Sequence, residues 1–265
     1  MPLAAWPLPS AQPAARRTIR LFGSAVELWW LPDRARRRPP TPPLVLTDRA
    51  PAILAREVLW RDGDAALTPN RYPFAVQAGI LWSTAAGREA SAALLDLAFG
   101  IAEPHGSALL NTIGAAATQP RAHVHVVGER LPFLSALPTV RVDGARIADG
   151  QWPGVDFVRL AAPFPGLVLG VRGARADRAR AAARLLALRA TPAANLVSDG
   201  DTTWFVPRRR ETPAPHFPAP LGCAELWGRF CYEDEAAFAA ADGEALARAY
   251  EAALCPCPPD GAPVI

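Results

Sequence analysis

The stretch from residue 107 to residue 128 constrains the fold most, because it predicts two adjacent strands around a bend of small residues. Ser107 to Ile113 (SALLNTI) has the character of a strand, and Gly114 to Thr118 (GAAAT) that of the bend. His123 to Gly128 (HVHVVG) then alternates as a second strand. Because side chains alternate between the two faces of a strand, His123 and His125 are expected on one face.

The remainder of the chain predicts strands and helices in two similar rounds. The first round has a strand at 74–83 and an amphipathic helix at 88–102 before the two strands above. The second has strands at 156–160 and 167–171, a helix at 174–189, and a hairpin of strands at 195–199 and 202–207. A strand at 224–232 and an amphipathic helix at 233–254 close the chain. This order predicts an α+β fold with two related halves, although no sequence repeat demonstrates a duplication.

The domain organisation follows from the proline-rich segments. Residues 1–20 are expected to form a poorly ordered tail, and the basic, proline-rich segment 34–43 is expected to form a solvated loop. The domain is expected at 21–254, with halves of about 21–150 and 151–254, followed by a tail at 255–265. No apolar run reaches the roughly 18 residues of a membrane span, so a cytoplasmic protein without membrane contact is expected.

The charged residues exclude some classes of function. The 28 basic residues are all arginine, against 25 acidic residues, so lysine Schiff bases and lysine-dependent phosphate loops are excluded. A net charge of +3 gives no electrostatic footprint for nucleic acid. The four cysteines are Cys223, Cys231, Cys255 and Cys257, whose spacing fits a zinc site poorly, so reduced thiols without a metal are expected.

Three nitrogen-rich side chains mark a candidate site. Alternation places Arg121, His123 and His125 on one strand face, where they would line one groove. Such a row suits a phosphate, because the middle imidazole can attack phosphorus and become nucleotidylated while its neighbours stabilise the charge of the transition state.

The sequence resembles the histidine-triad superfamily, and within it the phosphorylase branch. Asn111 to His123 is similar, without gaps, to the Asn, Gly, Ala/Thr and His run of GDP-hexose phosphorylases. Thr118-Gln119-Pro120 is similar to the Ser-Gln-Pro that precedes the triad in diadenosine tetraphosphate phosphorylases. Further similar stretches, in the same order, are Asn70 to Pro73, Asn195 to Asp199, Trp204 to Pro207 and Glu225 to Gly228. The resemblance covers about residues 65–254.

The resemblance implies an antiparallel sheet with flanking helices and a nucleotidyl transferase or phosphorylase. It places the nucleophile at His123 and the third triad position at His125, where these phosphorylases have Gln and the hydrolases have His. Arg121 stands at the first position, where His is expected. The residues expected to bind nucleotide or phosphate are Asn70, Arg71, Asn111, Gly114, Thr118, Gln119 and Arg121.

The expected ligands follow from the same branch. They are a nucleotide sugar, with GDP-hexose favoured, or a dinucleotide, together with inorganic phosphate or a sugar phosphate as acceptor. No cofactor and no metal is expected, because arginine, histidine and backbone donors can neutralise the phosphate. A homodimer is left open.

Several alternatives remain open at this stage. His125 at the third position favours a hydrolase of nucleotide conjugates, whereas the loss of the first histidine favours a degenerate nucleotide-binding or regulatory protein. In a second register, His123 and His125 would be the first two histidines, but this needs a two-residue insertion after Asn111. Two further alternatives concern single segments. Asn70 could simply cap a turn, and residues 208–210 could either form an exposed strand end or reach a phosphate.

Overall fold

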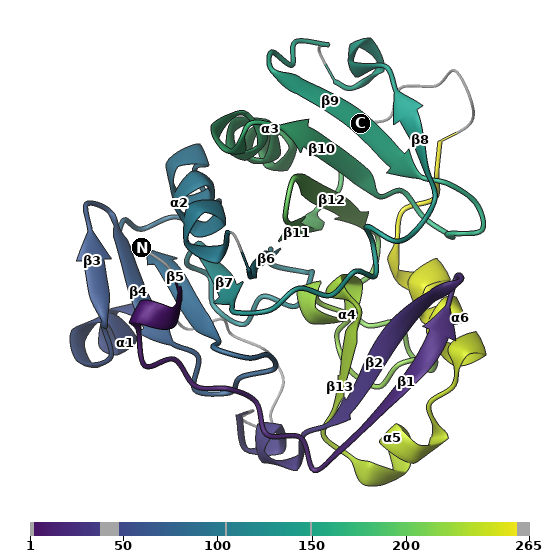
Figure 1. Cartoon of the computed structure of the whole chain (residues 1–265), viewed down its shortest axis with the longest axis horizontal. Coiled ribbons are helices and arrows are strands. Elements are labelled where there is room, and N and C mark those ends of the chain that lie inside the picture. Colours follow the sequence, from purple (N-terminus) through teal and green to yellow (C-terminus); the bar gives the residue numbers. More distant parts are fainter. Residues whose placement is uncertain (1–2, 38–47, 104, 149, 259–265) are drawn as a thin grey trace.

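A ten-stranded antiparallel sheet carries the predicted strand pair at its centre (Figure 1). The computed structural model describes residues 3–37, 48–103, 105–148 and 150–258. The sheet order is β3-β4-β5-β7-β6-β11-β12-β10-β9-β8. The strands are β3 (Trp60–Asp62), β4 (Ala65–Pro69), β5 (Gly79–Ser83), β6 (Ser107–Asn111), β7 (His123–Val127), β8 (Thr139–Val142), β9 (Val155–Leu160), β10 (Leu169–Gly173), β11 (Ala193–Asp199) and β12 (Thr202–Arg208).

The strand order is symmetric about the β6–β11 pair. Reading outward from that pair, β7, β5, β4 and β3 correspond to β12, β10, β9 and β8. Along the chain, each set of five strands has one helix between its third and fourth strands. This helix is α2 (Ala92–Ala102) in the first set and α3 (Arg175–Leu188) in the second. The five strands of each set lie within residues 60–127 and 139–208, so the sheet has the two-part plan of a duplicated unit.

Helices α2 and α3 pack side by side on one face of this sheet (Figure 1). Ser91 caps α2, because its side chain accepts a hydrogen bond from the backbone N–H of Leu94. Apolar side chains of both helices form one cluster with inward-facing strand residues, including Val124 and Val126 of β7. The alternate residues of β7, which include His123 and His125, therefore face the opposite side of the sheet.

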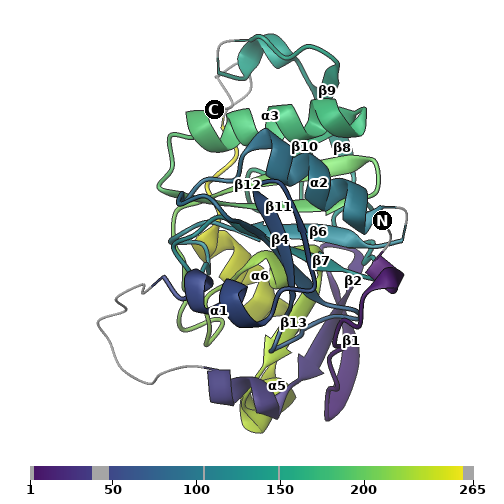
Figure 2. The ribbon, with the colours of Figure 1, turned by 90° about the vertical axis from the view of Figure 1, so that its left-hand side faces the viewer.

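A second layer covers part of that opposite face (Figure 2). It contains a three-stranded sheet in the order β1-β2-β13, in which β13 is parallel to β2. Its elements are β1 (Ala15–Leu21), β2 (Ser24–Trp30), β13 (Arg229–Tyr232), α4 (Cys223–Trp227), α5 (Glu235–Ala240) and α6 (Gly243–Ala253). Arg229 is buried between Glu27 and Glu129 and so joins this layer to the end of β7. Helix α1 (Ala50–Arg56) packs on Ala66 and Trp82 of the larger sheet.

These features confirm the predicted α+β fold, an antiparallel sheet with flanking helices. The expected hairpin at 195–199 and 202–207 is also confirmed, as β11 and β12. Other predicted segments differ from the structure in their order, their bounds or their type of element.

The segment 1–20 is a first difference. Its described part contains a 3-10 helix at Leu3–Ala5 and most of β1, which pairs with β2 over its whole length. Leu3 and Trp6 are buried against the larger sheet, because these apolar side chains cover its β3–β5 edge. The prediction of a poorly ordered tail is therefore wrong for the described residues.

The other differences concern the ends and types of elements. The strand predicted at 74–83 begins only at Gly79, because the backbone of Ala75, Gln77 and Ala78 bonds instead to residues 9–11 of the N-terminal segment. The strand predicted at 224–232 is α4 followed by β13, separated at Gly228, whose φ of 109° ends the helix. The helix predicted at 233–254 is α5 and α6, since Asp242 caps a new helix.

Two predicted loop or tail segments are only partly described. Pro32–Arg37 forms a 3-10 helix, whereas the rest of the loop predicted at 34–43 lies outside the described residues. Cys255, in the predicted C-terminal tail, exchanges backbone hydrogen bonds with Leu167 and Pro207. Residues 259–265 lie outside the described residues.

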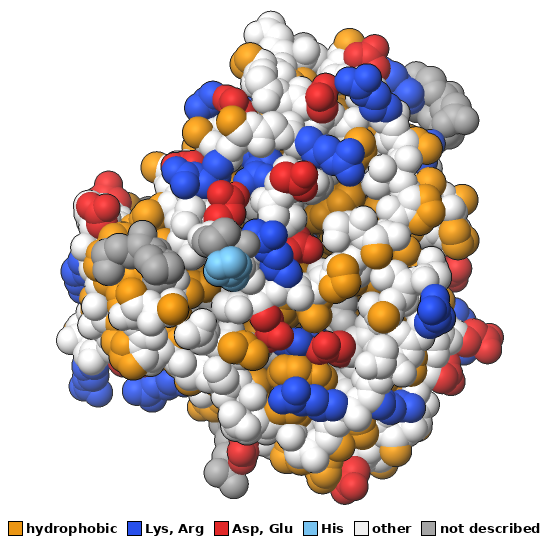
Figure 3. Space-filling model, in the orientation of Figure 1, with side chains coloured by type: hydrophobic (Ala, Val, Ile, Leu, Met, Phe, Trp, Pro, Cys, Tyr) orange, Lys and Arg blue, Asp and Glu red, His pale blue; other side chains and the backbone are white. Residues whose placement is uncertain are grey.

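The surface carries mixed charge. Acidic and basic side chains are interspersed over the face seen in Figure 3. Among the described residues, no helix is long and apolar enough to cross a membrane.

Gly114, in the bend before β7, generates a test of the fold. Its φ is 80°, a left-handed conformation that costs an L-residue about 1–2 kcal/mol. A Cβ at this position would also lie 3.3 Å from the Cβ of Ala193. We expect Gly114→Ala to lower the free energy of unfolding by about 1–2 kcal/mol, measured by urea denaturation.

Gly87→Ala is the matched control, because a Cβ there meets no atom within 4 Å and the residue has no positive φ. Equal stability losses in the two variants would contradict the argument.

Candidate active site

His123 begins β7 at the point where three strand ends and the bend come together. The register pairs His123 with Trp82 of β5, and Leu109 of β6 with His125. Asn111, at the end of β6, pairs with Asn195 of β11. Antiparallel pairing therefore gathers the two histidines and Asn111 at one end of the central strands.

A backbone hydrogen bond fixes the protonation of the His123 ring. Its Nδ1 lies 2.8 Å from the carbonyl oxygen of Arg121, and the residue is 5% exposed. Because a carbonyl oxygen only accepts, Nδ1 must carry the proton, and Nε2 of the neutral ring keeps its lone pair. Burial lowers the pKa of His123, while this hydrogen bond opposes the shift. Burial therefore favours the neutral imidazole, and the hydrogen bond defines Nε2 as its unprotonated nitrogen.

Aromatic rings hold the imidazole in place. Trp82 stacks on His123 with ring centroids 4.9 Å apart and planes inclined by 30°. The indole N–H of Trp82 donates to Thr68 Oγ1 at 2.9 Å, which fixes the indole in turn. The His125 ring lies edge-on to His123 at 5.5 Å, and Phe74 lies edge-on to His125 at 5.5 Å. Thr68, Trp82 and Phe74 could not be predicted from the sequence, because strand register brings Trp82 to His123 and tertiary packing brings Phe74 to His125 and Thr68 to Trp82.

Arg121, at the first triad position, is engaged by Asp48. Its Nε and Nη2 donate to Asp48 Oδ2 at 3.2 and 2.9 Å, and its Nη1 donates to the carbonyl oxygen of Thr84 at 2.7 Å. The hydrogen bond from Arg121 is the largest cause that lowers the pKa of Asp48. The Asp48–Arg121 pair lies on the wall of a cavity of about 260 Å³, whose other lining residues are Ala86, Gly87, Arg88 and Pro120.

Asn111 is tied into a buried chain of polar side chains. Its Oδ1 accepts from Asn195 Nδ2 and from the backbone N–H of Cys223, both at 2.7 Å. Asn195 Oδ1 accepts in turn from Arg208 Nη1 at 2.8 Å. Arg208 is fully buried, and burial lowers its pKa to about 10. Residue 208 is therefore neither an exposed strand end nor a phosphate ligand, and the chain fixes the end of β6 against β11 and α4.

The other expected ligands have structural partners. Asn70 Oδ1 accepts from the backbone N–H of Tyr72, and so forms the turn that was the alternative interpretation. Arg71 pairs with Glu57 at the surface. Gln119 Oε1 accepts from the backbone N–H of Arg49, which precedes α1, and Thr118 is exposed. Their roles in binding nucleotide stay predictions.

The His123 geometry generates a titration test. We expect NMR titration of His123 to give a pKa below the usual value of about 6.5, because the charged ring would lack solvation. The unfolded chain then binds more protons below about pH 6.5, so this contribution to stability is complete above that pH and decreases as the pH falls through it. The check compares urea unfolding of wild type and His123→Asn between pH 5 and 8, where only wild type should show this loss. A His123 pKa above the usual value would contradict the burial argument.

Comparisons with known proteins identify the fold. No protein-family model and no curated protein matches the sequence. The structure is similar to that of the yeast Ap4A phosphorylase Apa2 in complex with AMP, with a TM-score of 0.68, 12% sequence identity, and coverage of 96% of this chain and 92% of that chain. For the same enzyme in complex with Ap4A, the TM-score is 0.66 at 11% identity, with 94% and 91% coverage. An ADP-glucose phosphorylase from Arabidopsis thaliana with bound ADP-glucose gives a TM-score of only 0.43 at 10% identity, with 89% and 98% coverage, too low to support an argument.

The similarity to Apa2 spans almost the whole of both chains and includes the sheet on which His123 lies. It confirms, at the level of the fold, the resemblance to the histidine-triad superfamily that the motif around His123 predicted. The chain therefore has the fold of the yeast Ap4A phosphorylase Apa2.

Proposed function

We propose that this chain is a nucleotidyl transferase of the phosphorylase type, which acts through a covalent nucleotidyl intermediate on His123. The observation that carries the proposal is the hydrogen bond from His123 Nδ1 to the Arg121 carbonyl oxygen, which leaves Nε2 as the nucleophile. The fold supports a nucleotide as substrate, since the similar yeast enzyme is an Ap4A phosphorylase whose structures contain Ap4A and AMP.

The reaction would proceed in two displacements at the α-phosphorus. In the first, His123 Nε2 attacks, a P–N bond forms, and the bond to the bridging oxygen breaks, releasing the rest of the substrate as a phosphate ester. In the second, an oxygen of phosphate or a sugar phosphate attacks the same phosphorus and the P–N bond breaks. The imidazole returns to its neutral form. His125 would donate to a non-bridging oxygen as charge develops on it.

A nucleotide sugar of the GDP-hexose type is the substrate we favour. The support is the sequence similarity of the stretches at Asn111 to His123, Asn195 to Asp199 and Glu225 to Gly228 to those of GDP-hexose phosphorylases. With inorganic phosphate as acceptor, the products would be GDP and a hexose 1-phosphate. A dinucleotide is the second substrate class, supported by the fold.

Two other functions are each supported by one feature. A hydrolase is favoured by His125 at the third triad position, and a binding protein without turnover by the engagement of Arg121 with Asp48. Burial of His123 favours transfer over hydrolysis, because a nucleotidyl group there would be shielded from bulk water. Release of product only with phosphate would mark a phosphorylase, and release without phosphate a hydrolase. Binding of the nucleotide without release of product would mark a binding protein without turnover.

His123→Ala tests the nucleophile. We expect it to abolish phosphate-dependent turnover of GDP-hexoses and Ap4A, because the variant lacks the ring nitrogen that forms the P–N bond. Wild type, incubated with substrate and without phosphate, should carry one nucleoside monophosphate on His123, detected by mass spectrometry after denaturation. Full turnover in the variant would exclude the proposal, and unchanged near-ultraviolet circular dichroism would show that the variant is folded.

Substitutions of Asp48 and Arg121 test whether Arg121 binds the phosphate. If Arg121 holds the phosphate, Asp48 competes with it for the guanidinium. We expect Asp48→Asn to tighten nucleotide binding about threefold to tenfold, and Arg121→His to weaken binding and turnover together, measured by calorimetry and steady-state kinetics.

Asp96→Asn is the matched control, because it removes the ionic partner of Arg175 in the same way, between α2 and α3 on the other face of the sheet. Higher turnover of Arg121→His with unchanged binding would show that Arg121 only blocks an ancestral hydrogen-bond network.

A further inference from the structure

The second half of the sheet has a counterpart to the His123 site. The strand bounds give the correspondence, because β7 begins at His123 and β12 begins at Thr202. The residues that pair with them, Trp82 and Arg172, are each the fourth residue of their strand. Thr202 pairs with Asp199, in the register that the Leu109–His125 pair sets between β6 and β7. It follows that Thr202 stands in the place of His123, and Asp199 in the place of Asn111. Arg172, which pairs with Thr202, stands in the place of Trp82.

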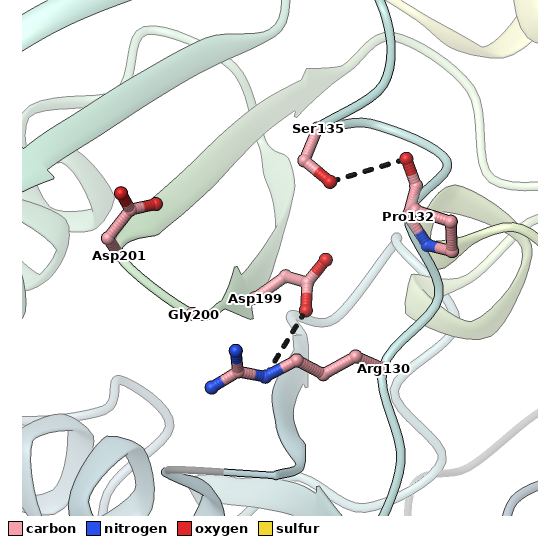
Figure 4. Close-up of a pocket in the computed structure, with 6 residues that line it drawn as sticks. All are labelled: Arg130, Pro132, Ser135, Asp199, Gly200 and Asp201. Atoms are coloured by element: carbon pink, nitrogen blue, oxygen red, sulfur yellow. Dashed lines mark hydrogen bonds and ion pairs between the residues drawn. The ribbon is translucent and has the colours of Figure 1, made fainter.

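A cavity of about 650 Å³ lies at this counterpart position. Its size falls within the range of small-molecule sites, roughly 300–1,000 Å³. Figure 4 shows the residues that line it: Arg130, Pro132, Ser135, Asp199, Gly200 and Asp201. They come from the end of β11, the β11–β12 turn and the segment that follows β7.

The Asp199 carboxylate has weaker hydrogen bonds than its counterpart Asn111. Its side chain is 7% exposed. Its Oδ1 lies 3.4 Å from Ser107 Oγ and 3.9 Å from Arg130 Nε, whereas the Asn111 oxygen accepts two hydrogen bonds of 2.7 Å. No described residue donates to the other Asp199 oxygen, which points into the space between Arg130 and Ser135 (Figure 4). A buried carboxylate with so few hydrogen bonds would be stabilised by further hydrogen-bond donors.

The charge balance of the cavity selects the kind of donor. The Asp199 and Asp201 carboxylates would repel an anion, and the Arg130 guanidinium would repel a cation. Arg130 Nε donates to the Gly106 carbonyl oxygen at 3.1 Å, while no described residue accepts from its terminal nitrogens. A ligand that donates to Asp199 and accepts from Arg130 satisfies both groups, and adjacent hydroxyl groups do so without carrying charge.

We propose that this cavity is a second ligand site, which binds a neutral polyol such as a sugar through two adjacent hydroxyls held by Asp199 and Arg130. Ser135, whose hydroxyl donates to the Pro132 carbonyl oxygen at 3.3 Å, can accept a further ligand hydroxyl. Burial raises the pKa of Asp199 to about 6, and Arg130 only partly opposes the shift, consistent with a carboxylate that lacks donors.

This site is separate from the nucleophile and binds without reacting. Asp199 and Asn195 lie four positions apart along β11, about 13 Å, and Asn195 adjoins the His123 end. Thr202, in the place of His123, offers no imidazole. The proposal therefore does not depend on the reaction at His123.

The test measures binding of D-glucose and D-ribose to the full chain by saturation-transfer NMR and titration calorimetry, with 1,4-diaminobutane and inorganic phosphate as charged probes. We expect saturable binding of at least one of the sugars, weakened about tenfold or more in Asp199→Asn, which loses charge-assisted hydrogen bonds worth about 1.5–3 kcal/mol. Asp156→Asn, at an exposed ion pair with Arg141, is the matched control and should bind as wild type does. His123→Ala should also retain sugar binding, which separates this site from the nucleotide site.

Thermal unfolding of Asp199→Asn checks its folding, and we expect its Tm to equal or exceed that of wild type because an underbonded carboxylate is removed. The proposal is overturned if neither sugar binds wild type, or if Asp199→Asn binds as tightly as wild type. Binding of 1,4-diaminobutane that depends on Asp199 and exceeds that of both sugars would overturn it in favour of a cation site. Phosphate binding that Asp199→Asn strengthens would overturn it in favour of an anion site.

Discussion

The antiparallel pairing of β6 with β11 is the interaction on which the rest of the structure depends. It joins the two halves of the ten-stranded sheet, and its register places Asn111 beside Asn195 at one end and Ser107 beside Asp199 at the other. A slip of one residue would turn every side chain of one half to the wrong face of the sheet. The buried Asn111–Asn195–Arg208 chain opposes such a slip, since its hydrogen bonds form in this register alone.

Equivalent positions in the two halves have different chemistry. At one end, His123 is stacked by Trp82, and its Nδ1 is hydrogen-bonded to a backbone carbonyl. At the other end, Arg172 contacts Thr202 through a hydrogen bond of 3.4 Å, and a carboxylate replaces the amide of Asn111. Duplication of the backbone plan therefore does not require duplication of the reaction, because a few side chains at the strand ends decide it.

The sequence predicted the elements whose periodicity is simple. Strand β7 was predictable because Val124 and Val126 face the helices while His123 and His125 face the other layer. Helix α4 was not, since the apolar run from Cys223 to Tyr232 fits a strand equally well and only Gly228 and the Glu225 cap mark a break. The burial of Arg208 was also not predictable, because its partners Asn195, Leu221 and Ala253 are brought together by tertiary packing.

Within the candidate site, the sequence singled out His123 but not the groups that surround it. The Arg121 carbonyl that orients His123 belongs to the backbone, so replacing the first triad histidine by arginine leaves this hydrogen bond in place. What the replacement changes is the side chain, whose charge is balanced by Asp48 from a segment about 70 residues earlier in the chain. A guanidinium balanced in this way adds little net positive charge to the site. If Arg121 holds the phosphate, as proposed, the energetic consequence of the substitution is decided by the competition between Asp48 and the phosphate for Arg121, because the hydrogen bond of the His123 ring is the same with either side chain at position 121.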